Sequence, residues 1–75
     1  MGQMTKTAKP VNRIAAKLRI VRLRRRMTQG ELAEATGLKP AAICHFERGA
    51  RQPNLRNLIR LADALGVSTD ELLCR

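Results

Sequence analysis

Aromatic side chains are nearly missing from this chain: Phe46 is the only one, and tryptophan and tyrosine do not occur. Aliphatic side chains must therefore supply the core, and 75 residues amount to one small domain with a core that is marginal for stability. Long apolar runs are missing too, since nothing approaches the ~20 residues of a membrane span and no apolar stretch typical of a signal peptide follows the N-terminal lysines. These absences argue against a membrane protein.

Metal ligands and reactive pairs are also scarce. Cys44 and Cys74 stand thirty positions apart, and His45 is the single histidine. This set is too small for a zinc site and makes a poor disulfide framework, so we expect no metal, no cofactor and a reducing, cytoplasmic location. Cys44 and His45 are neighbours, but adjacent residues on a helix diverge by about 100° and form no nucleophile–base pair. Because no phosphate loop is present either, we expect the chain not to be an enzyme.

Acidic residues are absent from the first third of the chain. Residues 1–26 carry nine basic groups and no acid, whereas residues 27–75 carry six of each, so the net charge of +9 belongs to the N-terminal block. Such a block favours a polyanion, with a phosphate backbone as the first candidate and an anionic membrane surface as the second. A solvated tail that only aids solubility is the remaining alternative. Nucleic acid is favoured because of the segment that follows.

That segment runs from Thr28 to Gly49, TQGELAEATGLKPAAICHFERG, and its pattern indicates two short helices joined by a turn. Thr28 and Glu31 make a Thr-x-x-Glu capping box, and Gly37 is a left-handed stop. Pro40 suits the first turn of a second helix that ends at Gly49. One side of this second helix holds Ile43, Phe46 and Glu47, and the other holds Ala41, Cys44, His45 and Arg48. The pattern predicts a helix–turn–helix whose second helix presents one face outward.

The N-terminal part is predicted to be an arm followed by a first helix. Residues 1–11 are polar and lack helical periodicity, so we expect a disordered basic arm before a domain over residues 12–75. Asn12 is the expected cap of a helix that runs to about Arg25. Its core stripe is Ile14, Leu18 and Val21, and a second apolar stripe, Ala16, Ile20 and Leu23, points away from the first. This second stripe is covered by the arm, is tolerated exposure, or is a contact surface for a second subunit or another protein.

Two more helices are predicted after the central segment. Asn54 caps a fourth helix that ends at Gly66 and has Leu55, Leu58, Ile59, Ala62 and Leu65 on one side. Ser68 and Glu71 make a second capping box, which opens a short last helix with Leu72 and Leu73. Because Leu, Ile and Ala recur at helical spacing with few β-branched runs, the chain is predicted to be all-α with five helices.

These residues carry a resemblance to a known family. From roughly Ile14 to Leu73, about four-fifths of the chain, the sequence resembles the Cro/C1-type (XRE-type) helix–turn–helix family of phage repressors and bacterial regulators. The matching pieces are MTQGELAEATGL, then an isoleucine and FERG, then QPNLRNLIRLADALGVSTDELL. The resemblance implies a compact, lambda-repressor-like DNA-binding domain that usually binds operator DNA as a two-fold dimer.

The resemblance also implies roles for individual residues. In this family, the glutamine that opens the second helix contacts a backbone phosphate and braces the recognition helix, and that position is Gln29. A helix N-terminus suits phosphate because its unpaired amides and its dipole point at the anion. The family's arginine late in the first helix pairs with the glutamate that closes the recognition helix, which here joins Arg22 to Glu47. The alternative for Glu47 is an exposed acid, but a carboxylate near a helix C-terminus is unfavourable unless it is paired.

The outward face of the recognition helix is expected to read bases, through Lys39, Pro40, Ala41, Cys44 and His45. Better-known members of the family have Gln, Ser, Thr, Asn or Arg at several of these positions, and paired hydrogen bonds usually read guanine and adenine. Only Lys39 and His45 offer strong hydrogen bonds here, so DNA shape, arm contacts and water carry specificity, or discrimination is modest. Phosphate contacts are expected from Thr28, Gln29, Arg48, Arg51 and Arg22.

Alternatives stay open at several of these positions. His45 contacts a base or a phosphate, or is passively exposed. Cys44 is a small residue that fits close to the groove, or a redox switch, because a modified sulfur there would collide with DNA. Arg48 and Arg51 are phosphate clamps or loop residues that aid solubility. The arm lysines, Lys6 and Lys9, are candidates to follow the groove.

Three functions follow from these observations. The leading hypothesis is a cytoplasmic transcriptional regulator, a repressor, that binds double-stranded operator DNA as a homodimer with helix 39–48 in the major groove. The second is an antitoxin or adaptor of the same fold that mainly binds a toxin-like protein partner through the Ala16, Ile20 and Leu23 stripe. The third is sequence-tolerant nucleic-acid binding through the basic arm. Dimer contacts in the family usually involve the last helix and its neighbours, so the candidates are Val67, Leu72 and Leu73.

Overall fold

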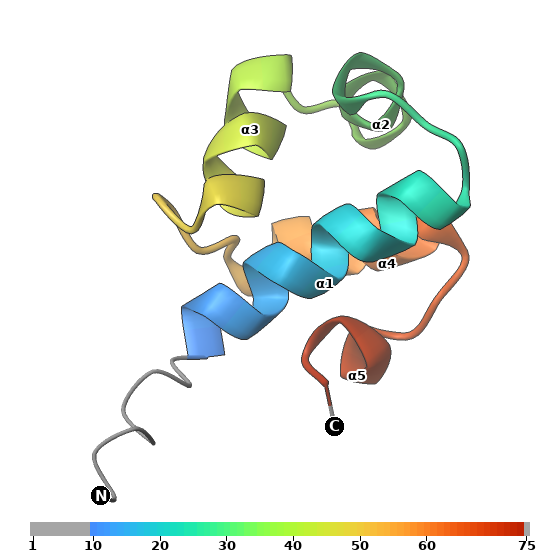
Figure 1. Ribbon diagram of the computed structural model, residues 1–75. Helices are drawn as coiled ribbons and strands as arrows, with labels where there is room; N and C mark the ends of the chain where they lie inside the picture. The colour runs from blue at the N-terminus through green and yellow to red at the C-terminus, as the bar shows by residue number, and fades with distance from the viewer. Residues whose placement is uncertain (1–9, 75) are drawn as a thin grey trace, which may run out of the picture.

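A computed structural model of the chain describes the backbone of residues 10–74 and the side chains of residues 14–74. This part of the chain forms five helices and no strand, which confirms the predicted all-α class (Figure 1). The helices are α1 (Pro10–Arg24), α2 (Gln29–Thr36), α3 (Pro40–Arg48), α4 (Leu55–Leu65) and α5 (Thr69–Leu72). Residues 1–9 lie outside the described part of the chain. They include most of the arm that is expected to be disordered, with Lys6 and Lys9.

The helices close a ring around one hydrophobic core. α1 contacts α3 and α5, α2 contacts α3 and α4, and α4 contacts α5. In Figure 1, α1 crosses the middle of the molecule in front of α4, with α2 and α3 above it and α5 below it. The largest fully buried side chains come from every helix and are all aliphatic: Leu18, Val21, Leu32, Ile43, Leu61, Leu65 and Leu72. Of the described helices, none has the length and apolar character needed to span a membrane.

α1 begins earlier than the sequence predicts. Its first residue is Pro10, so Asn12 lies inside the first turn and is not the cap. Proline is favoured at the first helical position because its fixed φ suits a helix and it has no N–H to leave unpaired. The expected core stripe of α1 is confirmed, since Ile14, Leu18 and Val21 are all buried.

Capping residues place the ends of α2, the first helix of the helix–turn–helix. The Thr28 hydroxyl accepts a hydrogen bond from the Glu31 N–H at 3.0 Å, and the Glu31 carboxylate accepts one from the Thr28 N–H at 2.8 Å. Gly37 then ends the helix at φ 76°, in the left-handed region that a glycine adopts without steric cost. These contacts confirm the predicted capping box and stop, and they determine where the turn toward α3 begins.

The last two helices agree with the sequence only in part. Asn54 caps α4 as predicted, and the Ser68 hydroxyl caps α5 by accepting from the Glu71 N–H at 3.1 Å. On α4, however, Leu55 and Ile59 are exposed by 70% and 44%, whereas Leu61 is buried. The expected stripe was wrong there because α2 and α5 cover the arc of Leu58, Leu61, Ala62 and Leu65. At about 100° per residue, positions 55 and 59 fall beyond one edge of this arc.

Candidate nucleic-acid interface

α3 has one buried face and one face turned to solvent. Ile43 and Phe46 are buried against the core, where α1 and α2 pack on the helix. Pro40 occupies its first turn, where a missing N–H costs nothing, and Lys39 precedes it without a capping hydrogen bond from its side chain. Gly49 ends the helix at φ 76°. The local sequence thus sets the length of α3, and the apolar spacing sets which face is left outside.

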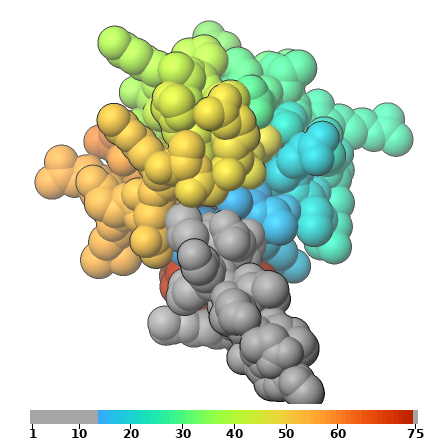
Figure 2. All heavy atoms as spheres, turned by 60° about the vertical axis from the view of Figure 1, so that its left-hand side comes forward, coloured from blue at the N-terminus to red at the C-terminus, as the bar shows by residue number. Residues whose placement is uncertain are grey.

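The expected base-reading residues lie together on and just before the solvent-facing side of α3. Lys39, Pro40 and Ala41 are exposed, while Cys44 and His45 are half-buried. Figure 2 turns this side of the molecule forward, with the yellow-green and yellow residues of α3 at the upper centre. A shallow hollow of about 400 Å³ borders the start of the helix, and it is lined by Gly37, Leu38, Lys39, Ala41, Ala42, His45 and Arg51.

His45 is less available than its place on the helix indicates. Its Nδ1 atom is buried and has no hydrogen-bond partner among the described residues. A buried polar atom without a partner is costly, so the ring gains if a bound molecule or a water supplies a hydrogen bond there. The half-buried ring therefore offers less contact area to a ligand than the exposed Lys39 side chain.

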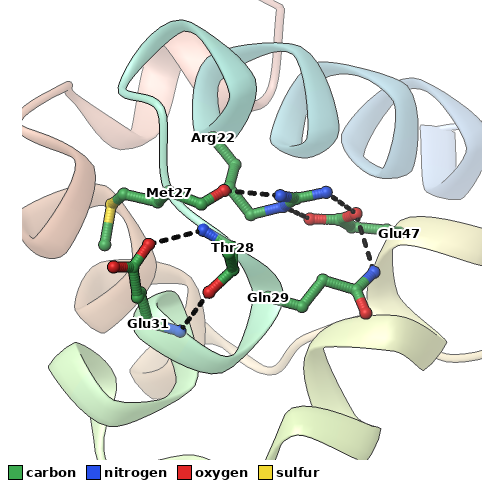
Figure 3. A network of polar contacts seen from close by, with 6 residues as sticks. All are labelled: Arg22, Met27, Thr28, Gln29, Glu31 and Glu47. Atoms are coloured by element: carbon green, nitrogen blue, oxygen red, sulfur yellow. Dashed lines mark hydrogen bonds and ion pairs between the residues drawn. The ribbon is translucent and has the colours of Figure 1, made fainter.

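A buried polar network attaches α3 to the two preceding helices (Figure 3). Arg22 Nε donates to Glu47 Oε2 at 2.5 Å, and Arg22 Nη2 donates to Glu47 Oε1 at 3.0 Å. The two side chains are only 8% and 3% exposed. Arg22 Nη1 also donates to the Met27 carbonyl at 2.6 Å, and Gln29 Nε2 donates to Glu47 Oε1 at 3.1 Å. The predicted Arg22–Glu47 pair and the bracing contact of Gln29 are therefore both present.

Burial in this network does not lower the pKa of Arg22. The hydrogen bond to Glu47 raises the pKa of Arg22 above its ordinary value, the charge of Glu47 adds to this effect, and desolvation opposes it. The guanidinium therefore stays charged and keeps both bonds to the carboxylate. Two parallel bonds fix the carboxylate plane as well as its distance, so Glu47 sets the orientation of the end of α3 relative to α1.

The remaining residues expected to contact phosphate lie around the two helix ends. Thr28 is exposed and Gln29 half-buried at the start of α2, while Arg48 and Arg51 are exposed at the end of α3 and in the loop after it. Arg48 Nη1 lies 3.9 Å from Cys44 Sγ. Arg22 differs from the others because it is only 7% exposed and is already engaged by Glu47 and Met27. Its geometry favours a positioning role over the predicted direct contact with phosphate.

One structural contact has no signal in the sequence. Arg25 Nε donates to the Leu65 carbonyl at 2.7 Å, which places a cation at the C-terminal end of α4. This end carries unpaired carbonyl groups and partial negative charge, so the contact is favourable. It joins residues 40 positions apart through a backbone atom, and a pattern of side chains cannot predict a backbone acceptor. Among the described residues, no cluster of side chains is suited to hold a metal ion.

The geometry agrees with a family match. A family model described as helix-turn-helix matches residues 18–72, well over half of the chain. The chain therefore belongs to the helix–turn–helix family, and its relatives place it among the Cro/C1-type members. This match confirms the family and the fold that the sequence predicts.

Two curated relatives are similar over most of the described domain. The cryptic phage CTXphi transcriptional repressor RstR of Vibrio cholerae is 38% identical over 48 residues, which are 64% of this chain and 43% of that protein. An uncharacterized HTH-type transcriptional regulator of Bacillus subtilis, YqaE, is 34% identical over 56 residues, 75% of this chain and 48% of that protein. The chain thus spans less than half the length of these two relatives.

Solved structures match more completely. The restriction-modification controller protein C.AhdI from Aeromonas hydrophila has a TM-score of 0.80 at 32% identity, covering 83% of this chain and 94% of that one. The P22 c2 repressor, solved in complex with a synthetic operator, has a TM-score of 0.76 at 32% identity, covering 79% of this chain and 89% of that one.

Proposed function

We propose that this chain is a DNA-binding transcriptional regulator, a repressor, which binds operator DNA through the outward face of α3. The observation that carries the proposal is the buried Arg22–Glu47–Gln29 network, which holds α3 beside the N-terminus of α2 with one face left in solvent. The major groove is about 12 Å wide and admits an α-helix. Similarity to a repressor solved with its operator supports the same use of this face.

The exposed charges around α3 are arranged to suit a duplex. Lys39 lies at the start of the helix, and Arg48 and Arg51 lie at its end, so cations flank a small apolar centre at Ala41. Phosphate contacts would come from the two arginines and from the start of α2, where the first backbone amides of a helix are available to an anion. Because Arg22 is occupied, we assign it the task of orienting Glu47.

A homodimer is the assembly that fits this mode of binding. Two copies related by a two-fold axis place their recognition helices in successive major grooves, about 34 Å apart on one side of the duplex. Of the residues expected at the dimer contact, Leu72 is fully buried in the core of its own subunit and has no side-chain surface to offer. Val67 and Leu73 are half-buried and stay candidates.

Selection of duplexes from a random pool at physiological salt tests this function. We expect the selected duplexes to share two half-sites related by two-fold symmetry, with centres about 10 base pairs apart. Lys39→Ala should weaken binding to the selected duplex more than to a scrambled one, whereas Arg60→Ala, on exposed α4 surface, should weaken neither. Equal affinity for selected and random duplexes would instead indicate sequence-tolerant binding. If the chain retains no DNA from the pool, the proposal is overturned.

A second candidate function is that of an antitoxin or adaptor that mainly holds another protein. The observation that favours it is the exposure of Ile20 and Leu23 on α1, by 46% and 51%. Ile20→Asp should then abolish capture of a protein partner while leaving the affinity for the selected duplex unchanged. Loss of DNA binding with retained partner binding would reject this assignment of the α1 surface.

A further inference from the structure

The side of α1 that points away from the core carries large apolar side chains in solvent. Ala16, Ile20 and Leu23 are all exposed, and they lie opposite the buried stripe of Ile14, Leu18 and Val21. In Figure 1, α1 stands in front of α4 and no described helix crosses over it. The predicted second stripe is therefore uncovered by the described part of the chain.

The spacing of these residues is that of a helix–helix seam. Four positions separate Ala16 from Ile20, and three separate Ile20 from Leu23, so they occupy successive d, a and d positions of a heptad. A β-branched residue at a and a leucine at d are the choices that suit a partner helix lying along the seam. Singly scattered apolar residues on a surface need no explanation, but an aligned series on one helix face marks a contact.

The residues that border the seam are basic on both sides. Arg19 lies at the g position, and Lys17 and Arg24 lie at e positions. Arg19 and Arg24 are exposed, and neither belongs to an ion pair within the described residues, whereas Lys17 Nζ lies 3.9 Å from Glu71 Oε2. We call Ala16, Arg19, Ile20, Leu23 and Arg24 the outer α1 face.

We propose that the outer α1 face binds an amphipathic helix of another protein that carries acidic residues along both sides of its apolar stripe. The charges at e and g positions select the partner in such seams, and a second copy of this chain would place arginine against arginine. DNA is also a poor occupant, because the apolar side chains at the centre of the face offer neither a charge nor a hydrogen bond to a phosphate. This inference rests on the second candidate function, which assigns a protein partner to this surface, and it specifies the chemistry of that partner.

A synthetic peptide tests the recognition chemistry directly. The probe has three heptads with leucine at a and d and glutamate at e and g, so that repulsion between its own charges opposes self-association. Its binding to the full chain is followed by fluorescence anisotropy. A peptide with lysine in place of every glutamate is the matched probe, and we expect it to bind about tenfold or more weakly because attractive contacts become repulsive ones.

Two pairs of variants assign the binding to α1. Ile20→Ser with Leu23→Ser should lower the affinity for the acidic peptide by at least about tenfold, because two large apolar side chains are no longer available to be buried in the complex. The matched control is Leu55→Ser with Ile59→Ser, which removes an exposed isoleucine and an exposed leucine from α4 and should leave binding unchanged. With Arg19→Glu and Arg24→Glu, the chain should bind the lysine peptide more tightly than the acidic one. The control variant, Arg56→Glu with Arg60→Glu on α4, should still prefer the acidic peptide.

Measurements on the unmutated chain keep the test independent of how the variants fold. Backbone amide shifts caused by the acidic peptide should map to residues 16–24. Shifts confined to α3 or α4, equal binding of the two peptides, or no binding at millimolar peptide would each overturn the proposal. Titration of the variants with the selected DNA duplex separates this result from the DNA-binding function: if the outer α1 face variants lose DNA and keep the peptide, the face belongs to nucleic acid.

Discussion

Glu47 links the end of α3 to the two helices that precede it. Its carboxylate accepts hydrogen bonds from Arg22 of α1 and from Gln29 of α2, so a single side chain joins three helices. Because the pKa of Arg22 is raised in the folded chain, the stabilisation from its charge is fully present below the ordinary arginine range. This stabilisation is lost only when the pH rises through the folded pKa, so titration of Arg22 itself causes no loss in acid.

Glu47→Ala should lower the free energy of unfolding by about 3 kcal/mol, because the Arg22 guanidinium is left buried without its partner. Such a loss is a large fraction of the stability of a small domain. Urea denaturation followed by circular dichroism measures it. Glu34→Ala, which removes an exposed carboxylate from α2, is the matched control and should change stability by less than about 0.5 kcal/mol. Equal melting of Glu47→Ala and the unmutated chain would contradict the structural role of the pair.

The turn between α1 and α2 is closed by an arginine in a conformation that favours glycine. Arg26 has φ 57°, whereas α2, α3 and α4 all end at a glycine with φ between 72° and 76°. The Met27 N–H donates to the Arg22 carbonyl at 3.2 Å, which ties the turn to the residue that holds Glu47. A side chain in the left-handed region costs about 1–2 kcal/mol.

Arg26→Gly should therefore raise the free energy of unfolding by about 0.5–1 kcal/mol, since relief of strain exceeds the extra freedom of glycine in the unfolded chain. Thermal and urea denaturation measure this gain. The control is Arg24→Gly, two residues earlier in the last turn of α1, where glycine should lower stability by up to about 1 kcal/mol. If both substitutions destabilise the chain equally, the backbone at Arg26 carries no strain.

Short-range signals predicted the ends of α2 correctly, although the cap predicted for α1, Asn12, was wrong. Thr28, Glu31 and Gly37 act within a few residues, and the structure places all three as the sequence predicts. The stripe on α4 failed at Leu55 and Ile59 because burial there depends on where α2 and α5 pack. Tertiary packing of this kind has no local signature. An apolar residue at helical spacing is only a candidate for the core.

The candidate site shows the same division between local and long-range information. The outward residues of α3 follow from helical periodicity within nine residues. The Arg22–Glu47 pair joins positions 25 apart, and it was predicted only through resemblance to a family. Arg25, whose partner is the Leu65 carbonyl, was not predicted at all. Contacts that end on backbone atoms leave no trace in the identity of the partner residue.

At the scale of the whole molecule, the net charge is concentrated at one end of the sequence, in the block that also contains the apolar seam of α1. The N-terminal block carries the net charge of +9, while the rest of the chain is balanced. A protein with this distribution approaches any polyanion quickly, and the general attraction falls with ionic strength. Because total charge alone produces salt-dependent binding, a test of the α3 interface must compare variants that have the same net charge.

Arg48→Gln with Arg51→Gln should make the plot of log affinity against log salt less steep by about 1.8. Each phosphate contact releases about 0.9 counterions on binding, and the double variant loses two such contacts. Fluorescence anisotropy with one selected duplex at several salt concentrations measures the slope. Arg56→Gln with Arg60→Gln reduces the net charge by the same two units, but on α4, and should leave the slope nearly unchanged. If the salt dependence becomes less steep by the same amount in both double variants, the arginines at the end of α3 act through total charge and contact no phosphate. A loss confined to the first variant assigns both contacts to the interface that α3 presents.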